Sequence, residues 1–388
     1  MLILNAPVIE IKESKCFISA LLCDGNQEKE LCYVIDTKYK NMLSISLEPF
    51  LFWGVLMAVK EKKDLFINGN IPKRLLYAIR HFLLNAFTKM GLYIPTIKIN
   101  EDKIIDETPY TAKGVATGLS GGIDSFYTIL EHTKGELLLT HLVEFFPTAT
   151  SLDLRSHTME LNQETILDEW NNKVKLELNL PIVKVYSNFT EYCTFPFEQI
   201  HTFCNLSHAL LLKGGISRYL YSTGHTLNQT KLDFGDTSHY DLLIAQIVNS
   251  ISFEMISYNP TVERIEKTAA IAQSKVVQKY LHVCVKREMG RGNCSCCFKC
   301  KRVMTQLDVI GRLNDFKETF DLDSYNKNRR KIWSEVLYRA KIMKDAFSQE
   351  TLLHAKVYNY KRPRWLFFRV LGIGLRNQIN KLKRLKKR

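Results

Sequence analysis

Residues 114–132 read GVATGLSGGIDSFYTILEH, which is an apolar run, a turn with two adjacent glycines and a second apolar run. The first run, Gly114–Leu119, is short and apolar, which predicts a buried strand. Residues 125–132 are predicted to open a helix, with Asp124 and Ser125 as cap residues. A strand that passes through a glycine turn into a helix is typical of a parallel α/β sheet. This stretch therefore decides the fold class.

Strand and helix signals continue to alternate after this turn. They predict strands at 137–145, 181–185 and 221–223 and helices at 151–171 and 205–219. Alternation of this kind indicates a parallel sheet with helices on both faces. We expect this α/β domain to span residues 113–310. A helical extension is predicted to follow over 311–350, within a helical pattern that runs from 303 to 349.

The first 105 residues predict a small α+β domain instead. Its expected strands are 7–20, 29–37, 64–67 and 94–100, its helices are 48–61 and 72–91, and a turn lies at 24–26. The polar residues 101–113 are interpreted as a linker into the second domain. With 388 residues, of which 46% are hydrophobic, the chain is long enough for two domains. No chemically active group of residues stands out in the first one.

The turn at 120–125, SGGIDS, has the features of an anion site. Gly121 and Gly122 let the backbone approach a ligand closely, and the N-terminus of the following helix presents N–H groups to a phosphate. Asp124 suits a magnesium ion. The spacing is neither that of a Walker A loop nor that of a dinucleotide fingerprint. The alternative interpretation is an ordinary glycine turn in which Asp124 and Ser125 only cap the helix.

Five of the ten cysteines lie within the seventeen positions 284–300. Four of them, Cys284, Cys294, Cys297 and Cys300, have a spacing that can close a tetrahedral zinc site, with no position left for water. Cys296 falls outside this register, although it could replace a neighbour as ligand. Basic residues around the group, among them Arg302, would offset the negative charge of a zinc tetrathiolate centre. An iron–sulfur cluster is the alternative metal centre.

The glycine turn resembles the phosphate loop of the ATP pyrophosphatase (PP-loop, adenine nucleotide α-hydrolase-like) superfamily. Together with the cysteine spacing it resembles the 7-cyano-7-deazaguanine synthase branch, the queuosine-pathway members. Residues 294–302, CSCCFKCKR, are similar to that branch's cysteine signature, with Ser295 where glycine is usual. Residues 266–272, EKTAAIA, loosely resemble its TK-x-E-I element, with the order of Lys267 and Thr268 reversed. The resemblance covers residues 113–310.

The resemblance implies an enzyme that splits ATP into AMP and pyrophosphate, with Mg²⁺ and Zn²⁺ as further cofactors. Ser120, Gly121, Gly122, Asp124 and Ser125 would then hold the pyrophosphate end of ATP, and Ser120, Asp124 and Lys267 would act in catalysis. The acceptor would be a carboxylate or amide, such as a 7-carboxy-7-deazapurine, which is adenylated and then coupled to ammonia or an amine.

The branch's base-recognising stretch has no clear counterpart in this chain. A polar segment, residues 221–241, stands in its place after a predicted strand. Strand ends line the ligand crevice of open α/β sheets, which makes its polar side chains candidates for substrate contact. They are His225, Asp233, Asp236, His239 and Asp241. A solvated turn-forming loop is the alternative. Arg218, Arg264 and Lys267 could reach phosphate, although each could equally be a surface charge.

Residues 361–388 carry eleven Lys or Arg residues and no acid, so they account for most of the formal net charge of +14. The rest of the chain is nearly neutral, which argues against nucleic-acid binding by the body. The basic segment also contains aromatic and aliphatic residues, and three interpretations remain open. They are contact with an anionic membrane surface or acidic partner, contact with nucleic acid, and docking of a terminal helix on the enzyme.

We therefore expect a cytoplasmic ATP-dependent ligase, since no signal peptide and no apolar run of membrane-spanning length are found. A second hypothesis keeps the loop but makes the reaction tRNA thiolation or sugar amidation. A third is a non-catalytic, zinc-stabilised nucleotide-binding scaffold. Whether the chain forms a homodimer is left open by the sequence.

Overall fold

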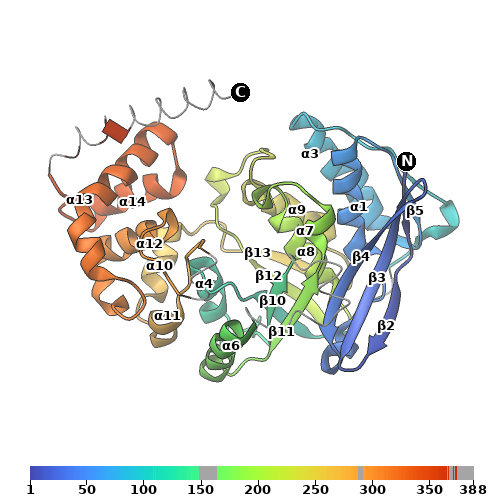
Figure 1. Ribbon diagram of the computed structural model, residues 1–388, viewed down its shortest axis with the longest axis horizontal. Helices are drawn as coiled ribbons and strands as arrows, with labels where there is room; N and C mark the ends of the chain where they lie inside the picture. Colours follow the sequence, from blue (N-terminus) through green and yellow to red (C-terminus); the bar gives the residue numbers. More distant parts are fainter. Residues whose placement is uncertain are drawn as a thin grey trace. The chain divides into compact units, whose positions relative to one another are not determined.

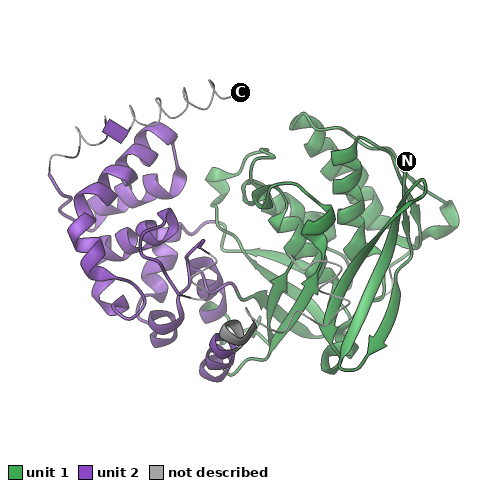
Figure 2. Ribbon diagram, viewed as in Figure 1, with its two compact units in different colours: residues 1–119, 131–165, 179–260 green, residues 120–130, 166–178, 261–388 purple. Residues whose placement is uncertain are grey.

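The computed structural model describes residues 1–107, 109, 111–147, 164–286, 292–364, 366, 370 and 372–373. The chain forms two compact units, coloured green and purple in Figure 2. Unit 1 comprises residues 1–119, 131–165 and 179–260, and unit 2 comprises residues 120–130, 166–178 and 261–388.

Unit 1 contains an eleven-stranded sheet (Figure 1) in the order β13-β12-β9-β10-β11-β4-β3-β1-β5-β7, with β2 paired to β3. The strands are β1 (Leu2–Asn5), β2 (Val8–Lys12), β3 (Lys15–Asp24), β4 (Gln27–Asp36), β5 (Leu65–Asn68), β7 (Ile97–Ile99), β9 (Gly114–Gly118), β10 (His141–Phe146), β11 (Ile182–Ser187), β12 (Ile216–Ser222) and β13 (Glu254–Tyr258). Two short strands, β6 (Ile71–Pro72) and β8 (Ile104–Ile105), pair separately. Strands β9 to β13 pair in parallel, as do β1, β5 and β7. The expected α/β class with a mostly parallel central sheet and flanking helices is confirmed.

The N-terminal strands form antiparallel hairpins. The segment 7–20, predicted as one strand, is two strands, because the chain turns between β2 and β3 at Glu13, which has a φ of 50°. The predicted turn at 24–26 joins β3 to β4, and Gly25 there has a φ of +59°, which glycine adopts without cost.

Strands from before and after the predicted linker, residues 101–113, belong to the same sheet. Strand β4 pairs antiparallel with β11, with Tyr33 opposite Ser187 and Ile35 opposite Val185. Residues 31–35 of β4 are all buried, as expected for a strand inside a sheet rather than at its edge. Residues 1–105 therefore share one sheet and one hydrophobic core with the parallel strands, rather than enclosing a core of their own.

The helices of unit 1 are α1 (Glu48–Glu61), α2 (Lys73–Ala78), α3 (Leu84–Lys89), α7 (Phe189–Tyr192), α8 (His201–Leu211) and α9 (Asp241–Val248). Helix α1 has the predicted bounds. It packs on β1 and β5 and against α8, so its residues 48–59 are buried on all sides. The helix predicted at 72–91 is found as α2 and α3 with a π-helical turn, Ile79–Leu83, between them.

The helix predicted at 205–219 is wrong in its second half. Helix α8 ends at Leu211, and β12 begins at Ile216. Gly214 and Gly215 separate them, and both glycines lie against backbone or core atoms. A Cβ at Gly214 would lie 2.6 Å from the carbonyl oxygen of Leu43, and one at Gly215 would lie 2.7 Å from Met42. The close approach requires glycine there and ends the helix.

Strand β9 lies between β10 and β12. The next two strands of the parallel part, β10 and β11, lie on one side of it, and the last two, β12 and β13, lie on the other side. Ligands of open α/β sheets bind beyond the carboxyl ends of the strands at such a point. Strand β9 ends at Gly118, just before the glycine turn, and β12 ends at Ser222, just before the polar segment. Thr117 joins the two strands, since its hydroxyl donates to the Leu220 carbonyl oxygen over 2.7 Å.

Unit 2 is helical. Its helices are α4 (Ile123–Glu131), α6 (Glu164–Leu178), α10 (Arg264–Ile271), α11 (Lys275–Tyr280), α12 (Phe298–Val309), α13 (Leu322–Tyr338) and α14 (Ala346–Val357). Helices α10, α12, α13 and α14 pack against one another around the buried Trp333. The helical pattern predicted at 303–349 corresponds to α12, α13 and α14 with turns between them.

Two predicted segments fall largely outside the described residues. Residues 151–163 of the helix predicted at 151–171 are not described, and α6 begins at Glu164. Of the basic segment 361–388, the described residues are 361–364, 366, 370, 372 and 373, so its expected amphipathic helix and its partners stay predictions. Leu366 is buried against the core that includes Trp333. Among the described residues, no helix is long and apolar enough to cross a membrane.

Candidate functional site

The glycine turn connects β9 to α4, which begins at Ile123, two residues before the predicted start. Gly121 has a φ of +76°, a conformation that side chains rarely adopt. A Cβ at Gly121 would also lie 3.1 Å from His282 Cβ and 3.2 Å from the Trp170 ring. Glycine is thus required here by the local fold. At Gly122 a Cβ would meet Ser120 Oγ at 3.4 Å and the His282 carbonyl oxygen at 3.9 Å, which are ordinary contacts, so the local fold tolerates a side chain there.

Two serines close the turn on itself. The backbone N–H of Ser120 donates to Ser125 Oγ over 3.2 Å, and the N–H of Gly122 donates to Ser120 Oγ over 3.3 Å. Ser125 is buried in the first turn of α4. The structure therefore brings the five loop residues predicted to bind ATP together at one helix N-terminus, where the helix dipole favours an anion.

Asp124 lies between two cations of α10. Arg264 Nη2 donates to Asp124 Oδ2, and Lys267 Nζ lies 3.7 Å from Asp124 Oδ1. The side chain of Lys267 is only 2% exposed, and that of Asp124 is 18% exposed. Arg264 and Lys267 share a helix face because they are three residues apart. Both cations therefore lie at the carboxylate in the first turn of α4.

A third cation extends this group. The Arg264 and Arg302 guanidinium carbons lie 4.1 Å and 4.5 Å from the ring centroid of Phe347. Burial, together with the nearby charge of Arg264, lowers the pKa of Arg302 to about 10. Arginine forks with a partly desolvated charge are suited to binding phosphate oxygens. Arg302, expected beside the cysteines as a charge offset, also belongs to the environment of Asp124.

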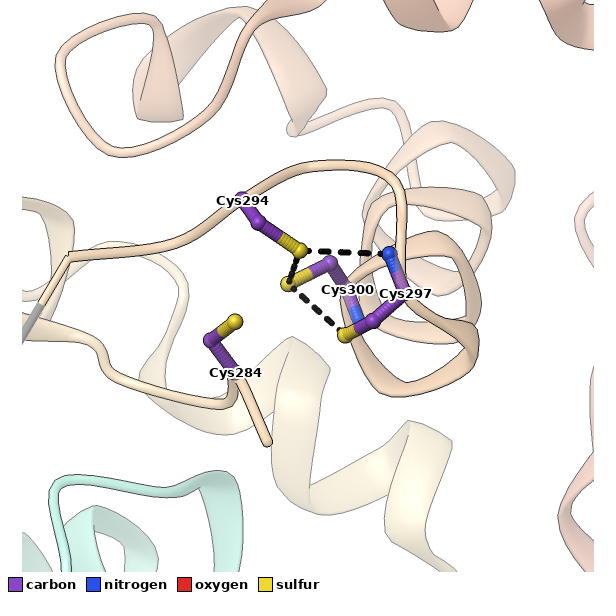
Figure 3. A group of neighbouring side chains, drawn as sticks. All are labelled: Cys284, Cys294, Cys297 and Cys300. Atoms are coloured by element: carbon purple, nitrogen blue, oxygen red, sulfur yellow. Dashed lines mark hydrogen bonds between the residues drawn. The ribbon is translucent and has the colours of Figure 1, made fainter. Parts of the chain in front are cut away.

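Cys284, Cys294, Cys297 and Cys300 form one group in unit 2, with all four sulfur atoms within 4.8 Å of one another. In Figure 3, Cys297 and Cys300 lie at the start of α12, Cys294 lies on the loop before it, and Cys284 lies on a separate segment. The Cys294 and Cys300 sulfurs are 4.0 Å apart, and the Cys297 and Cys300 sulfurs are 3.4 Å apart. Four ligands about 2.3 Å from a zinc ion place neighbouring sulfurs about 3.8 Å apart. The geometry can therefore hold a metal ion such as zinc.

Local electrostatics favour a cation in this group. Burial opposes ionisation of Cys294, but hydrogen bonds from the backbone N–H groups of Cys296 and Cys297 lower its pKa to about 6. Burial and the adjacent Cys297 sulfur raise the pKa of Cys300, a cost that a bound cation would remove. Cys296 is exposed and lies outside the group of four, as its register predicts.

The cysteine group is tied to the glycine turn through residues 281–284. Asn293, next to Cys294, donates to the Leu281 carbonyl oxygen over 2.7 Å and accepts from the Val283 N–H over 2.9 Å. Between those two residues, the His282 N–H donates to the Gly121 carbonyl oxygen over 2.7 Å. One backbone hydrogen bond thus joins the turn to the segment that ends at Cys284.

The predicted substrate residues lie in unit 1, and all five have partners there. Asp236 caps the 3₁₀ turn Thr237–His239 and lies 3.1 Å from His201 Nε2. Burial disfavours the charge of Asp236, but the bonds from His201 and Ser238 lower its pKa. Asp241 is 3% exposed and accepts from the Thr223 hydroxyl over 2.7 Å. Both carboxylates hold the polar segment in shape.

The other three polar candidates form a second group. The His225 and His239 rings have centroids 4.8 Å apart, and His239 Nδ1 lies 3.3 Å from Asp233 Oδ2. Asp233 also pairs with Lys231 at 2.9 Å. Burial and the nearby charge of Lys231 lower the pKa of His239. His225 Nδ1 lies 3.0 Å from Gln229 Oε1, so the members of this group also have partners within the polar segment.

Arg218 does not join any of these groups, since its Nε pairs with Glu254 Oε2 at 3.2 Å across β12 and β13. Sequence reasoning missed Trp170, His282 and Phe347, which shape the turn and stack on the arginines. Only the three-residue spacing of Arg264 and Lys267 could have indicated a shared site.

The chain matches no family model, no curated protein and no solved structure. The α/β architecture and a four-cysteine group able to hold a metal ion are therefore what the structure itself establishes.

Proposed function

We propose that this chain is an ATP-dependent ligase that releases AMP and pyrophosphate, related in function to 7-cyano-7-deazaguanine synthase. The observation that supports it most is the pairing of Asp124 with Arg264 and Lys267. Asp124 lies in the first turn of α4, immediately after Gly121 and Gly122 in the chain. A helix N-terminus, a close-approach glycine and a cluster of cations all favour a polyphosphate.

In the proposed reaction, a carboxylate oxygen of the acceptor attacks the α-phosphorus of ATP. The bond to the bridging oxygen breaks, and pyrophosphate leaves with the electron pair. Ammonia or an amine then attacks the acyl carbon, loses a proton, and displaces AMP. Ser120, Gly121, Gly122 and Ser125 would hold the departing pyrophosphate through the turn and the helix N-terminus.

Lys267 and Arg264 would offset the charge that develops on the pyrophosphate, which is electrostatic rather than covalent catalysis. Asp124 would hold these two cations in position. It would also be a carboxylate ligand for the Mg²⁺ that accompanies ATP. A zinc ion in the cysteine group would have a structural role, since four thiolates leave no position for water. If the substrate follows the resemblance, the acceptor is a 7-carboxy-7-deazapurine.

The thiolation hypothesis requires a reactive thiol, and four of the five cysteines outside residues 284–300 do not favour it. Cys16, Cys32, Cys193 and Cys204 are buried, and burial raises the pKa of Cys193 to about 12. A thiol that stays protonated is a poor nucleophile. The hypothesis of a non-catalytic scaffold does not explain why Lys267 is buried beside Asp124, because burying a charge is costly.

The test is incubation of the protein with ATP, Mg²⁺, ammonium and candidate carboxylic acids, followed by mass spectrometry. AMP and pyrophosphate in equal amounts are expected, and ADP would overturn the proposal. Asp124→Asn should lower AMP release by roughly 10²- to 10³-fold, by analogy with the loss of one charge-stabilising group. Asp315→Asn, on an acid paired with Arg312 away from this group, is the matched control and should release AMP at the unaltered rate.

A further inference from the structure

Unit 1 contains a cavity of about 750 Å³ that the sequence analysis did not anticipate. It lies where β1 and β5 end and where α1 begins. Asn5 and Asn68, the last residues of these parallel strands, are register partners, and Asn68 Nδ2 donates to Asn5 Oδ1 over 2.8 Å. Ligand sites form at the carboxyl ends of parallel strands, and this volume suits a small molecule.

A buried ion pair lines the cavity. Lys213 Nζ donates to a carboxylate oxygen of Glu48, the first residue of α1, and the two side chains are 3% and 8% exposed. Because the charges neutralise one another, this pair offers no net charge to a ligand. It also holds the cavity wall in one conformation, since separating a buried pair is costly.

The remaining lining leaves no net positive charge for an anion. Lys103 Nζ lies 3.8 Å from Asp102 Oδ2. The Glu107 carboxylate accepts from the Ser252 hydroxyl and from the Ile251 N–H. Asp106 adds a further acid, and no arginine among the described residues lines the cavity. Phosphate and carboxylate ligands bind most strongly to cationic side chains, and the acids in this lining, Glu48 at the start of α1 among them, repel such ligands.

Apart from Ser46 and Gly69, apolar and amide side chains make up the rest of the lining. The apolar residues are Ala6, Pro7, Ile45, Leu47, Pro72 and Ile105. Asn70, which is exposed, joins Asn5 and Asn68. An asparagine amide presents a donor and an acceptor side by side, which matches the lactam or amidine edge of a heterocycle such as a nucleobase. Proline and aliphatic side chains provide flat apolar contact for the ring.

We propose that this cavity binds an uncharged heterocycle of nucleoside size, held through its amide-type edge by Asn68 and Asn70. This site is distinct from the glycine turn and does not depend on the proposed ATP chemistry.

The probes are adenosine, guanosine and 5′-AMP, with binding to the full chain followed by ligand-observed NMR. At least one nucleoside should bind saturably with a millimolar or smaller Kd. Asn70→Ala should weaken binding about five- to tenfold, as expected for one lost hydrogen bond. Asn41→Ala changes an exposed asparagine of unit 1 that does not line the cavity, and should leave the Kd unaltered.

Ala6→Phe places a ring at an exposed lining position and should abolish binding while the far-UV spectrum stays unchanged. Nucleoside binding that survives Ala6→Phe at full affinity would locate the ligand elsewhere and overturn the proposal. A 5′-AMP site that Ala6→Phe abolishes and that binds more tightly than the adenosine site would also overturn it, because the lining has no charge for the phosphate. Absence of saturable binding by both nucleosides would also overturn it, whatever the outcome with ATP.

Discussion

Gly121 and Gly122 are adjacent, yet the structure predicts opposite consequences for an alanine at each. Gly121→Ala forces a left-handed conformation, which costs about 1 kcal/mol, and presses the new methyl against His282 and Trp170 at 3.1–3.3 Å. Overpacking of this kind adds about 1–3 kcal/mol. We expect the free energy of unfolding to fall by about 2–4 kcal/mol.

Gly311→Ala is the matched control, because Gly311 is also in unit 2 and has a φ of +73° but no atom within 4 Å of the added Cβ. It should cost only the conformational part, about 1 kcal/mol. The difference between the two variants in urea denaturation measures the packing of the turn against His282 and Trp170. Equal losses would show that this packing contributes nothing.

Gly122→Ala should change the free energy of unfolding by less than about 0.5 kcal/mol, since its Cβ meets ordinary contacts at 3.4 Å and 3.9 Å. It should nevertheless weaken ATP binding at least about tenfold in calorimetry, because a methyl group would stand where the phosphate approaches the backbone. Unchanged ATP affinity in a folded Gly122→Ala protein would refute the role of the turn as a phosphate site.

Two further predictions concern the metal group and pH. Elemental analysis should find roughly one zinc per chain in the unaltered protein. The Cys284→Ser variant should lose this zinc, whereas the Cys296→Ser variant should keep it. Equal metal content in both variants would remove Cys284 from the ligand set. His208 is fully buried, donates through Nδ1 to the Cys204 carbonyl oxygen, accepts through Nε2 from Ser187, and has its pKa lowered to about 4 by burial. Since the unfolded chain binds this proton near pH 6.5, stability should be full above pH 6.5 and fall by about 1.4 kcal/mol per pH unit down to about pH 4. His208→Gln should remove that part of the slope in denaturation curves, and an identical slope in both proteins would contradict the assignment.

The sequence predicted those elements that depend on residue types and spacings within one short segment of the chain. Helix α1 was predicted with its observed bounds, because a long apolar run ends where Lys62 takes a left-handed conformation. The glycine turn and the group of four cysteines were also readable, since both depend on short spacings along the chain. Where glycines interrupt a helical pattern, as at Gly214 and Gly215, the same reasoning missed the boundary because the requirement for glycine comes from Met42 and Leu43.

Residue types and short spacings thus determined the α/β class, the turn at 120–125 and the four-cysteine group. The tertiary structure alone decided that β4 joins β11 in one sheet and that Arg264 reaches Asp124 from 140 residues away. It also decided that Asp236 and Asp241 brace a loop, and that a cavity opens beside Asn5 and Asn68. The physical reason is range: conformational preferences and ligand spacings act within a few residues. Strand pairing, ion pairs and cavities depend on which distant segments the core brings into contact.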